Sequence, residues 1–232
     1  MIPPDFDIWF AELRKRALDA GISEKVLRSA LDGLTPRTSV IEQDRNQSEF
    51  SRPVWDYLDA AVSKDRIEVG RIVMASNVSL FERIKERFRV SGGIVAAIWG
   101  IETGFGAIRG NEPVVAALAT LAWEGRRAAL FEGELLAALE ILEAGDISCE
   151  GMIGSWAGAM GHTQFMPTTY VRHAVDFDGD GRRDIWGEDP SDALASAAAY
   201  LSASGWVDGS RWGAEAHLPE EFDLSLTGRQ TW

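Results

Sequence analysis

A single glutamate, Glu102, follows an almost wholly apolar segment. The preceding residues, 94–101, include no charged side chain, and Gly104 and Gly106 follow two and four positions after it. A carboxylate in apolar surroundings is costly to ionise, so burial would raise the pKa of Glu102 towards the range of a general acid. The glycines permit close approach of a ligand or of another backbone segment. The alternative is a helix-terminal glutamate that faces solvent or pairs with Arg109.

A second candidate group lies in a segment rich in glycine and alanine, residues 154–166. Ser155 and Gln164 are polar residues of this segment, and Pro167 after it suits the first turn of a new helix. The segment does not fit the G-x-S-x-G turn of esterases, because Ile153 occupies the place of the first glycine. We therefore expect either a tight packing turn or a loop that brings Ser155 and Gln164 to a site.

A third group is acidic and has the spacing of a calcium loop. Asp176, Asp178 and Asp180 fit positions 1, 3 and 5 of an EF-hand loop, with Gly181 at position 6 and the carbonyl of Arg182 at position 7. Three carboxylates this close repel one another unless a cation lies among them. The pattern predicts a calcium site, with a cluster of Asp-Gly turns as the alternative.

This loop departs from the EF-hand pattern at its end. Position 12, which normally holds a bidentate glutamate, is Gly187. A later acid must complete the ligand shell in a loop longer than twelve residues. We expect Asp192 in this role, with Asp189 and Glu188 as alternatives.

The periodicity of apolar residues predicts a mainly α-helical chain with little β structure. A polar stretch over residues 35–51 is expected to be a long surface connection, and residues 207–232 have no clear period. Residues 94–101 are apolar on every side, which indicates a helix buried all round. Start and stop signals predict a helix between Asp5 and Gly21 and another from Ser23 to near Gly33. Further helices are predicted over residues 126–144 and 190–204, with a helical pattern over residues 54–90.

Composition excludes several classes of function. The 232 residues carry 23 Lys and Arg against 36 Asp and Glu, a formal charge of −13, and no basic cluster. Nucleic acid and anionic lipid are therefore not expected as partners. The single cysteine, Cys149, excludes an intramolecular disulfide and a zinc site built on several thiolates. No apolar run is long enough to span a membrane, and no signal sequence opens this chain.

Taken together, these segments resemble the lytic murein transglycosylase B family, lysozyme-like enzymes that cleave bacterial peptidoglycan. The likeness is almost continuous from about residue 94 to residue 206, and its motifs follow in the family's order. The matching segments are Gly100 to Thr103 with Gly106, Ala117 to Leu121, Arg126-Arg127, Ala157 to Gly161, Gln164 to Pro167, Asp176 to Gly181, and Tyr200 with Gly205-Trp206.

The resemblance implies a lysozyme-like transglycosylase fold in three parts. A flanking N-terminal helical region would cover residues 1–90, and a catalytic core would cover residues 91–207, with the calcium loop at 176–192. Residues 208–232 would form an irregular, truncated segment, because family members carry a further helical block with a Tyr and Asn motif that nothing after Trp206 matches.

The resemblance also implies a role for each candidate residue. Glu102 would be the catalytic acid and base, and Ser155 would orient its carboxylate. Gln164 and Tyr200 would line the saccharide cleft, while Arg126 and Arg127 would meet the peptide stem or, alternatively, be a solvated charge at a helix start. The calcium site of Asp176, Asp178, Asp180, Asp192 and the Arg182 carbonyl would be structural, and catalysis would need no cofactor.

The implied reaction cleaves the β-1,4 bond between N-acetylmuramic acid and N-acetylglucosamine and forms a 1,6-anhydromuramoyl end. Ordinary glycosidases use two carboxylates, yet near Glu102 there is no second acid at a comparable apolar position, which suits a reaction that needs one. The alternatives are a lysozyme-type hydrolase and a non-catalytic peptidoglycan-binding or scaffold protein.

The resemblance implies peptidoglycan glycan strands as the partner, together with cell-wall synthesis proteins, and it implies a monomer. The expected location is the periplasm or the outer membrane of a Gram-negative bacterium. The signal sequence that such a location requires is absent from this chain.

Overall fold

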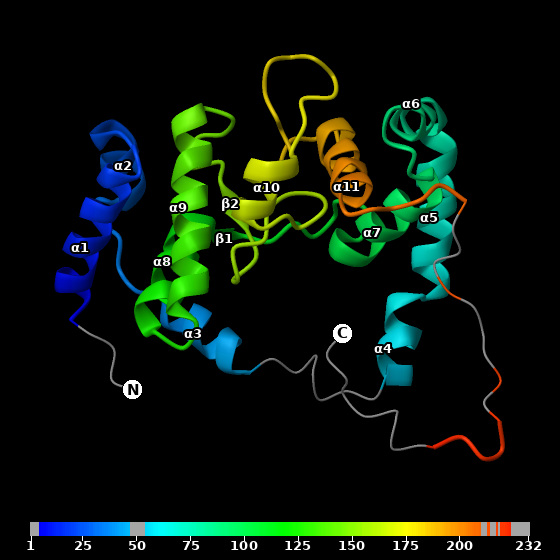
Figure 1. Cartoon of the computed structure of the whole chain (residues 1–232), viewed down its shortest axis with the longest axis horizontal. Coiled ribbons are helices and arrows are strands. Elements are labelled where there is room, and N and C mark those ends of the chain that lie inside the picture. Colours follow the sequence, from blue (N-terminus) through cyan, green and yellow to red (C-terminus); the bar gives the residue numbers. More distant parts are fainter. Residues whose placement is uncertain (1–4, 47–53, 210–212, 214–216, 218, 224–232) are drawn as a thin grey trace.

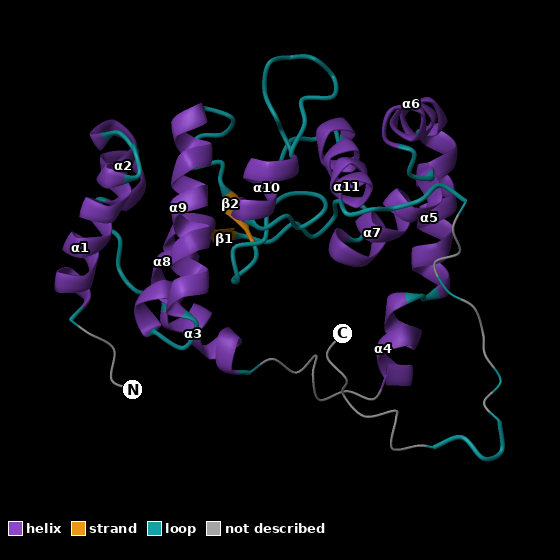
Figure 2. Ribbon diagram, viewed as in Figure 1, coloured by secondary structure: helices purple, strands orange, loops and turns teal. Residues whose placement is uncertain are grey.

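The computed structural model describes residues 5–46, 54–209, 213, 217 and 219–223. This part of the chain is mostly helical and has one small antiparallel sheet (Figure 1; Figure 2), so the predicted mainly α class is confirmed. The helices are α1 (Phe6–Asp19), α2 (Glu24–Leu31), α3 (Thr38–Arg45), α4 (Val54–Ala61), α5 (Lys64–Ser76), α6 (Val78–Phe88), α7 (Gly92–Thr103), α8 (Val114–Glu124), α9 (Ala128–Ala144), α10 (Pro167–His173) and α11 (Ser191–Ala203), and the strands are β1 (Glu112–Pro113) and β2 (Ile153–Gly154).

The first hydrophobic cluster joins the N-terminal helices to α8 and α9. Leu13 and Leu27 are fully buried in it together with Leu118 and Leu135. Local sequence explains where these helices begin: the Asp5 carboxylate accepts hydrogen bonds from two backbone N–H groups of α1, and the Ser23 hydroxyl accepts one from α2. Burial of these apolar faces holds α1, α2 and α3 against the α8–α9 pair.

The second hydrophobic cluster joins α6, α7 and α11. Phe81 and Ile84 of α6 are buried against Trp99 of α7 and Leu194 of α11. The first half of the chain is therefore divided between the two clusters, and each part of it packs on helices from the second half (Figure 1).

The small sheet and the segment over residues 154–166 lie between these two groups of helices (Figure 2). Glu112 of β1 pairs with Gly154 of β2, and isolated bridges join Gly154 to Met160 and Met160 to Phe165. Close approach depends on Gly110, which has a φ of 91° and on which a Cβ atom would lie 2.1 Å from the carbonyl oxygen of Gly154. The 154–166 segment is thus a tight loop with fixed pairing.

Two helices of the structure were not predicted. The polar stretch over residues 35–51 contains α3, because Val40 is fully buried against the first cluster and the backbone N–H of Arg37 donates to Thr120 Oγ1 at 3.1 Å. Residues 47–51 of that stretch lie outside the described residues. Helix α8 was not predicted as a helix, because its residues are apolar on all sides and have no 3.6-residue period.

The expectation that residues 94–101 form a helix buried all round was also wrong. Ala97 and Ile101 of α7 are exposed, and they border an apolar groove of about 250 Å³ whose other wall is α5. Ile67 and Met74 of α5 line this groove and are themselves exposed. Helix α7 is therefore buried along Val95, Trp99 and Thr103 but open to solvent along Ala97 and Ile101.

An aromatic ring separates α5 from α7. The Phe105 side chain packs between two glycines, since a Cβ atom on Gly70 would lie 3.0 Å from its ring and one on Gly100 only 2.6 Å away. The ring also contacts Trp99 edge-on, with centroids 5.8 Å apart. The absence of side chains at positions 70 and 100 is what admits the ring.

Membrane spans and domain boundaries were also predicted from the sequence. Within the residues that the structure describes, no helix is both apolar and long enough to cross a membrane. The domain boundaries near residues 90 and 207 stay predictions. Much of the predicted irregular segment 208–232 lies outside the described residues, namely 210–212, 214–216, 218 and 224–232.

Candidate active site

Glu102 lies in the last turn of α7, directly before the residue that ends the helix. Gly104 and Phe105 adopt left-handed conformations, with φ of 59° and 61°, and they turn the chain away from the helix axis. The Glu102 side chain is exposed, so the expectation that apolar neighbours bury this carboxylate was wrong. The physical reason is the open side of α7, on which Ile101 is also 47% exposed.

Thr103, the next residue along the chain, fixes the end of α7 to the 154–166 loop. Its buried hydroxyl donates to the carbonyl oxygen of His162 at 2.7 Å and accepts a hydrogen bond from the N–H of Gly106 at 3.0 Å. Buried hydrogen bonds of this kind are costly to break. The backbone beside Glu102 therefore has a defined position relative to the loop.

His162 forms a second connection between α7 and the loop. Its Nδ1 accepts a hydrogen bond from Trp99 Nε1 at 3.1 Å, and its Nε2 lies 2.8 Å from the carbonyl oxygen of Gly187, which assigns the proton to Nε2. Burial lowers the pKa of this imidazole, and the Arg109 charge acts in the same direction, while the bond to Gly187 opposes both. His162 thus joins α7 to the end of the acidic loop, residues 176–192.

Arg109 completes this set of connections. Its Nη1 donates to the carbonyl oxygens of Trp186 at 2.7 Å and of Gly187 at 2.8 Å, and its Nη2 pairs with Glu188 at 3.0 Å. Its own carbonyl oxygen accepts a hydrogen bond from Gln164 Nε2 at 3.3 Å. Polar contacts therefore join the segment after Glu102 to the 154–166 loop and to the end of the acidic loop.

The three residues expected beside Glu102 lie on or against this loop. Ser155 Oγ accepts a hydrogen bond from the N–H of Ala159 at 3.0 Å, which closes a turn. Gln164 has a φ of 52° and also donates to the carbonyl oxygen of Gly161 at 2.9 Å. Tyr200 of α11 is 41% exposed and contacts Phe165 edge-on, with centroids 6.1 Å apart. Their roles toward a glycan stay predictions.

Arg126 and Arg127 lie elsewhere, at the corner between α8 and α9. In Figure 1 this corner and α7 lie on opposite sides of the small sheet. Both guanidinium groups bind Asp44 of α3, which is only 3% exposed: Arg126 Nε donates to Oδ2 at 2.8 Å and Arg127 Nη2 donates to Oδ1 at 2.5 Å. The arginine side chains remain 48% and 39% exposed.

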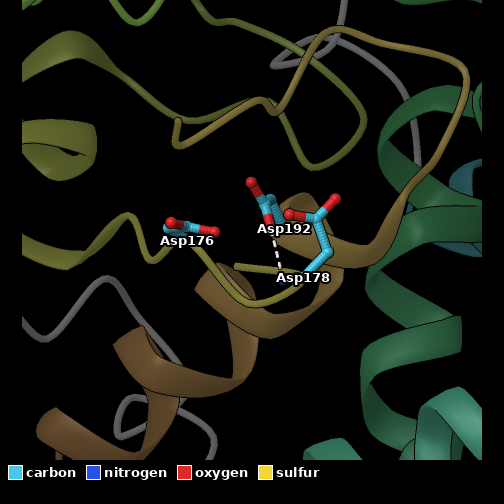
Figure 3. Close-up of side chains that lie close together, drawn as sticks. All are labelled: Asp176, Asp178 and Asp192. Carbon is cyan, nitrogen blue, oxygen red and sulfur yellow. Dashed lines mark hydrogen bonds between the residues drawn. The ribbon is translucent and has the colours of Figure 1, made fainter. Parts of the chain in front are cut away.

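The acidic loop brings three of its predicted ligands together. Carboxylate oxygens of Asp176, Asp178 and Asp192 all lie within 4.8 Å of one another. Figure 3 shows Asp192 on the first turn of α11, beside the loop that carries the other two. Asp192 was the first choice for the acid that replaces position 12, and the structure places it in this group. Asp180 and the Arg182 carbonyl stay predictions as ligands.

Asp192 also organises the loop backbone. Its Oδ1 accepts hydrogen bonds from the N–H groups of Phe177 at 2.7 Å and Asp178 at 3.3 Å, and its Oδ2 accepts one from Asp184 at 2.9 Å. Burial raises the pKa of this carboxyl and the charge of Asp178 adds to that effect, whereas the three N–H groups lower it. A divalent cation among these oxygens would favour the ionised form.

Further polar contacts hold residues 176–183 of this loop in place. Asp176 accepts hydrogen bonds from the N–H groups of Gly179 at 2.7 Å and Gly181 at 2.9 Å. Arg183 pairs with Asp146, which follows α9, at 2.6 Å. Oxygen-rich, preformed loops of this kind suit calcium, which takes six to eight oxygen ligands.

Three residues that organise the site were not predicted. Asp44, Thr103 and Arg109 act through partners that lie far away in the sequence, such as Arg126, His162 and Gly187. Arg109 was considered only as a partner of Glu102. For Asp44 the sequence pointed the wrong way, because it lies in a segment predicted as a surface connection. In the structure Asp44 is buried.

Comparisons with known proteins identify the class. The family described as "Transglycosylase SLT domain" matches residues 5–232. The membrane-bound lytic murein transglycosylase B of Escherichia coli (strain K12) is 35% identical over 189 residues, which are 81% of this chain and 50% of that protein. The chain belongs to this transglycosylase family, and the predicted membership is confirmed.

Solved structures of transglycosylases have the same fold as this chain. SltB3 from Pseudomonas aeruginosa in complex with NAG-NAM-pentapeptide has a TM-score of 0.90 at 49% identity, over 96% of this chain and 59% of that one. The same protein has been solved with NAG-anhNAM-pentapeptide. Escherichia coli Slt35 in complex with calcium has a TM-score of 0.78 at 32% identity, over 90% of this chain and 65% of that one.

The chain is shorter than these relatives. It spans half of the matched transglycosylase B and about three fifths of SltB3. The family and the fold of this chain follow from these comparisons.

Proposed function

We propose that this protein is a peptidoglycan lytic transglycosylase that cleaves the bond between N-acetylmuramic acid and N-acetylglucosamine. The observation that carries the proposal is Glu102, a single carboxylate at the end of α7, beside a residue that is hydrogen-bonded to the 154–166 loop. The SltB3 complexes with NAG-NAM-pentapeptide and NAG-anhNAM-pentapeptide support it, because these ligands represent the two sides of such a reaction.

One carboxylate has to act twice in this reaction. As an acid, Glu102 donates its proton to the glycosidic oxygen while the bond from that oxygen to the muramic C1 breaks. As a base, it then takes the proton of the muramic 6-hydroxyl, and that oxygen forms a new bond to C1. Atoms balance without water, and the product is a 1,6-anhydro sugar.

The distribution of acids supports this mechanism over a hydrolase with two carboxylates. Neither α7 nor residues 151–166 contain a second Asp or Glu. Glycosidases of the usual kind place two carboxyl groups on either side of the bond. Because Glu102 is exposed, a bound glycan strand would itself have to exclude water from the carboxylate.

Product mass tests the proposal. The whole chain, incubated with purified sacculi, is expected to release muropeptides that end in anhydromuramic acid. Products heavier by one water would identify a lysozyme-type hydrolase. Binding to sacculi without release of soluble fragments would identify a non-catalytic binding protein, and either result contradicts the proposal.

The other site residues have supporting roles in the proposal. Ser155 orients the Glu102 carboxylate, and Gln164 and Tyr200 line the saccharide cleft. Arg126 and Arg127 meet the peptide stem, whose carboxylates suit paired guanidinium groups.

We further propose that Asp176, Asp178 and Asp192, with Asp180 and the Arg182 carbonyl, hold a structural calcium ion. The spacing of the three carboxylates and the calcium complex of Slt35 support this assignment. Catalysis needs no cofactor, since one carboxylate supplies both proton transfers.

Calcium removal is expected to lower the thermal midpoint. An ion that binds only the folded state at a hundredfold excess over its Kd adds about 2.7 kcal/mol of stability, and in a chain of this size each kcal/mol shifts the midpoint by roughly 2–4 °C. Differential scanning fluorimetry with EDTA and with added calcium measures the shift. Asp178→Asn should be much less responsive to calcium, and equal midpoints of the native protein in both buffers would contradict the site.

The substrate implies where the protein acts. Peptidoglycan strands are its partner, and the periplasm or the outer membrane of a Gram-negative bacterium is its location. The matched Escherichia coli relative is described as membrane-bound. In this proposal the protein acts as a monomer, together with cell-wall synthesis proteins.

A further inference from the structure

The buried carboxylate of Asp44 lies under the two arginines that are proposed to meet the peptide stem. It is the acceptor for both: Arg126 donates to Oδ2 through Nε and also to the Asp44 carbonyl oxygen at 2.9 Å, and Arg127 donates to Oδ1. One residue of α3 thus fixes two adjacent guanidinium groups that belong to the α8–α9 corner.

Fixing them side by side has an electrostatic cost, because like charges repel. One carboxylate of −1 against two guanidinium groups of +1 each leaves a local sum of +1, in a chain whose formal charge is −13. The neighbouring Arg45 and Glu124 pair at 2.6 Å and cancel each other. The cluster is therefore a small positive site on an acidic protein.

The arginines keep donors for another ligand. A guanidinium has five N–H groups, and the contacts with Asp44 use only part of them. Both side chains remain well exposed, at 48% and 39%, and the Arg127 guanidinium lies 4.7 Å from the centre of the Phe131 ring. Each guanidinium group is held by Asp44 and still has N–H donors exposed to solvent. A preorganised anion site requires this combination.

We propose that Asp44 is a positioning residue for substrate recognition: it holds Arg126 and Arg127 in the arrangement that binds carboxylates of the peptide stem. This inference rests on the proposed function. Asp44 touches no substrate and acts only through the two arginines. Without it the guanidinium groups would repel each other and lose their fixed spacing.

Binding tests this role without requiring cleavage. The probes are NAG-NAM-pentapeptide and the same disaccharide without its peptide, titrated calorimetrically into the whole chain. Asp44→Asn is expected to weaken binding of the pentapeptide ligand about tenfold, on the scale of a charge-assisted hydrogen bond, and to change binding of the peptide-free sugar less than about twofold. A merely structural role would weaken both ligands equally.

Two further variants keep the test decisive. Arg127→Gln changes an exposed side chain and leaves the Asp44–Arg126 contact, so it should show the same selective loss even if Asp44→Asn fails to fold. Glu132→Gln breaks a comparable interhelical ion pair, with Arg16 at 2.6 Å, and should leave both ligands unaffected.

The inference is overturned if the Asp44 and Arg127 variants change neither affinity or change both equally. This result is separate from that of the product assay. A protein that releases no anhydro sugars would refute the proposed reaction, while the peptide-dependent affinity difference would still report on Asp44.

Discussion

Replacing Glu102 by glutamine is expected to reduce the release of anhydro-muropeptides by roughly a thousandfold or more, because general acid and base catalysis by one group accounts for factors of this order. Glutamine has nearly the same shape as glutamate but neither donates the proton that the leaving oxygen needs nor accepts one from the 6-hydroxyl. Liquid chromatography with mass detection of soluble fragments measures the rate.

The fold should survive this change. Glu102 is exposed, and exposed substitutions usually alter stability by less than about 0.5 kcal/mol. Thermal melting therefore serves as the check. Glu82→Gln, which changes an exposed glutamate of α6, is the matched control and should retain full activity. A Glu102→Gln protein as active as the control would remove Glu102 from the mechanism.

Replacing Asp192 by alanine is expected to destabilise the protein by about 3 kcal/mol or more even without calcium. The buried carboxylate accepts hydrogen bonds from three backbone N–H groups, and each one left unpaired in the interior costs roughly 1–3 kcal/mol. Asp192 also lies in the first turn of α11, where a negative charge is favourable. The midpoint should fall by about 10 °C.

A neighbouring aspartate separates this effect from loss of the metal. Asp178 belongs to the same group of three carboxylates but is exposed. Asp178→Asn should therefore lose calcium-dependent stabilisation while keeping most of the midpoint measured in EDTA. If both variants melt like the native protein in EDTA, the carboxylate of Asp192 does not hold the loop together in the way described.

Much of the fold could be predicted because most of its helices have local start and stop signals and a helical period of apolar residues. Residues 126–144 and 190–204 were expected as helices and form α9 (Ala128–Ala144) and α11 (Ser191–Ala203). Helix α3 was missed because a single fully buried apolar residue, Val40, anchors a polar sequence. Val40 is buried because α3 packs on α8. A contact between helices so far apart in the sequence leaves no trace in the local sequence pattern.

The candidate site divides in the same way. The acidic loop could be predicted because Asp176 and Asp178 are close in sequence, and Asp192 follows within the same segment. The exposure of Glu102 could not, because whether the apolar side of α7 meets a partner depends on the position of α5. The role of Asp44 could not be predicted for a related reason, because its partners Arg126 and Arg127 are more than 80 positions away in the sequence.

The ring of Phe105 between Gly70 and Gly100 has a consequence for the evolution of this fold. A side chain gained at either glycine would occupy the space of the ring, and a smaller residue at position 105 would leave a void between α5 and α7. No one of the three positions can change freely while the other two stay as they are. Positions 70, 100 and 105 should therefore vary as a set, so that a lineage with a smaller residue at 105 can accept a methyl group at 70 or 100.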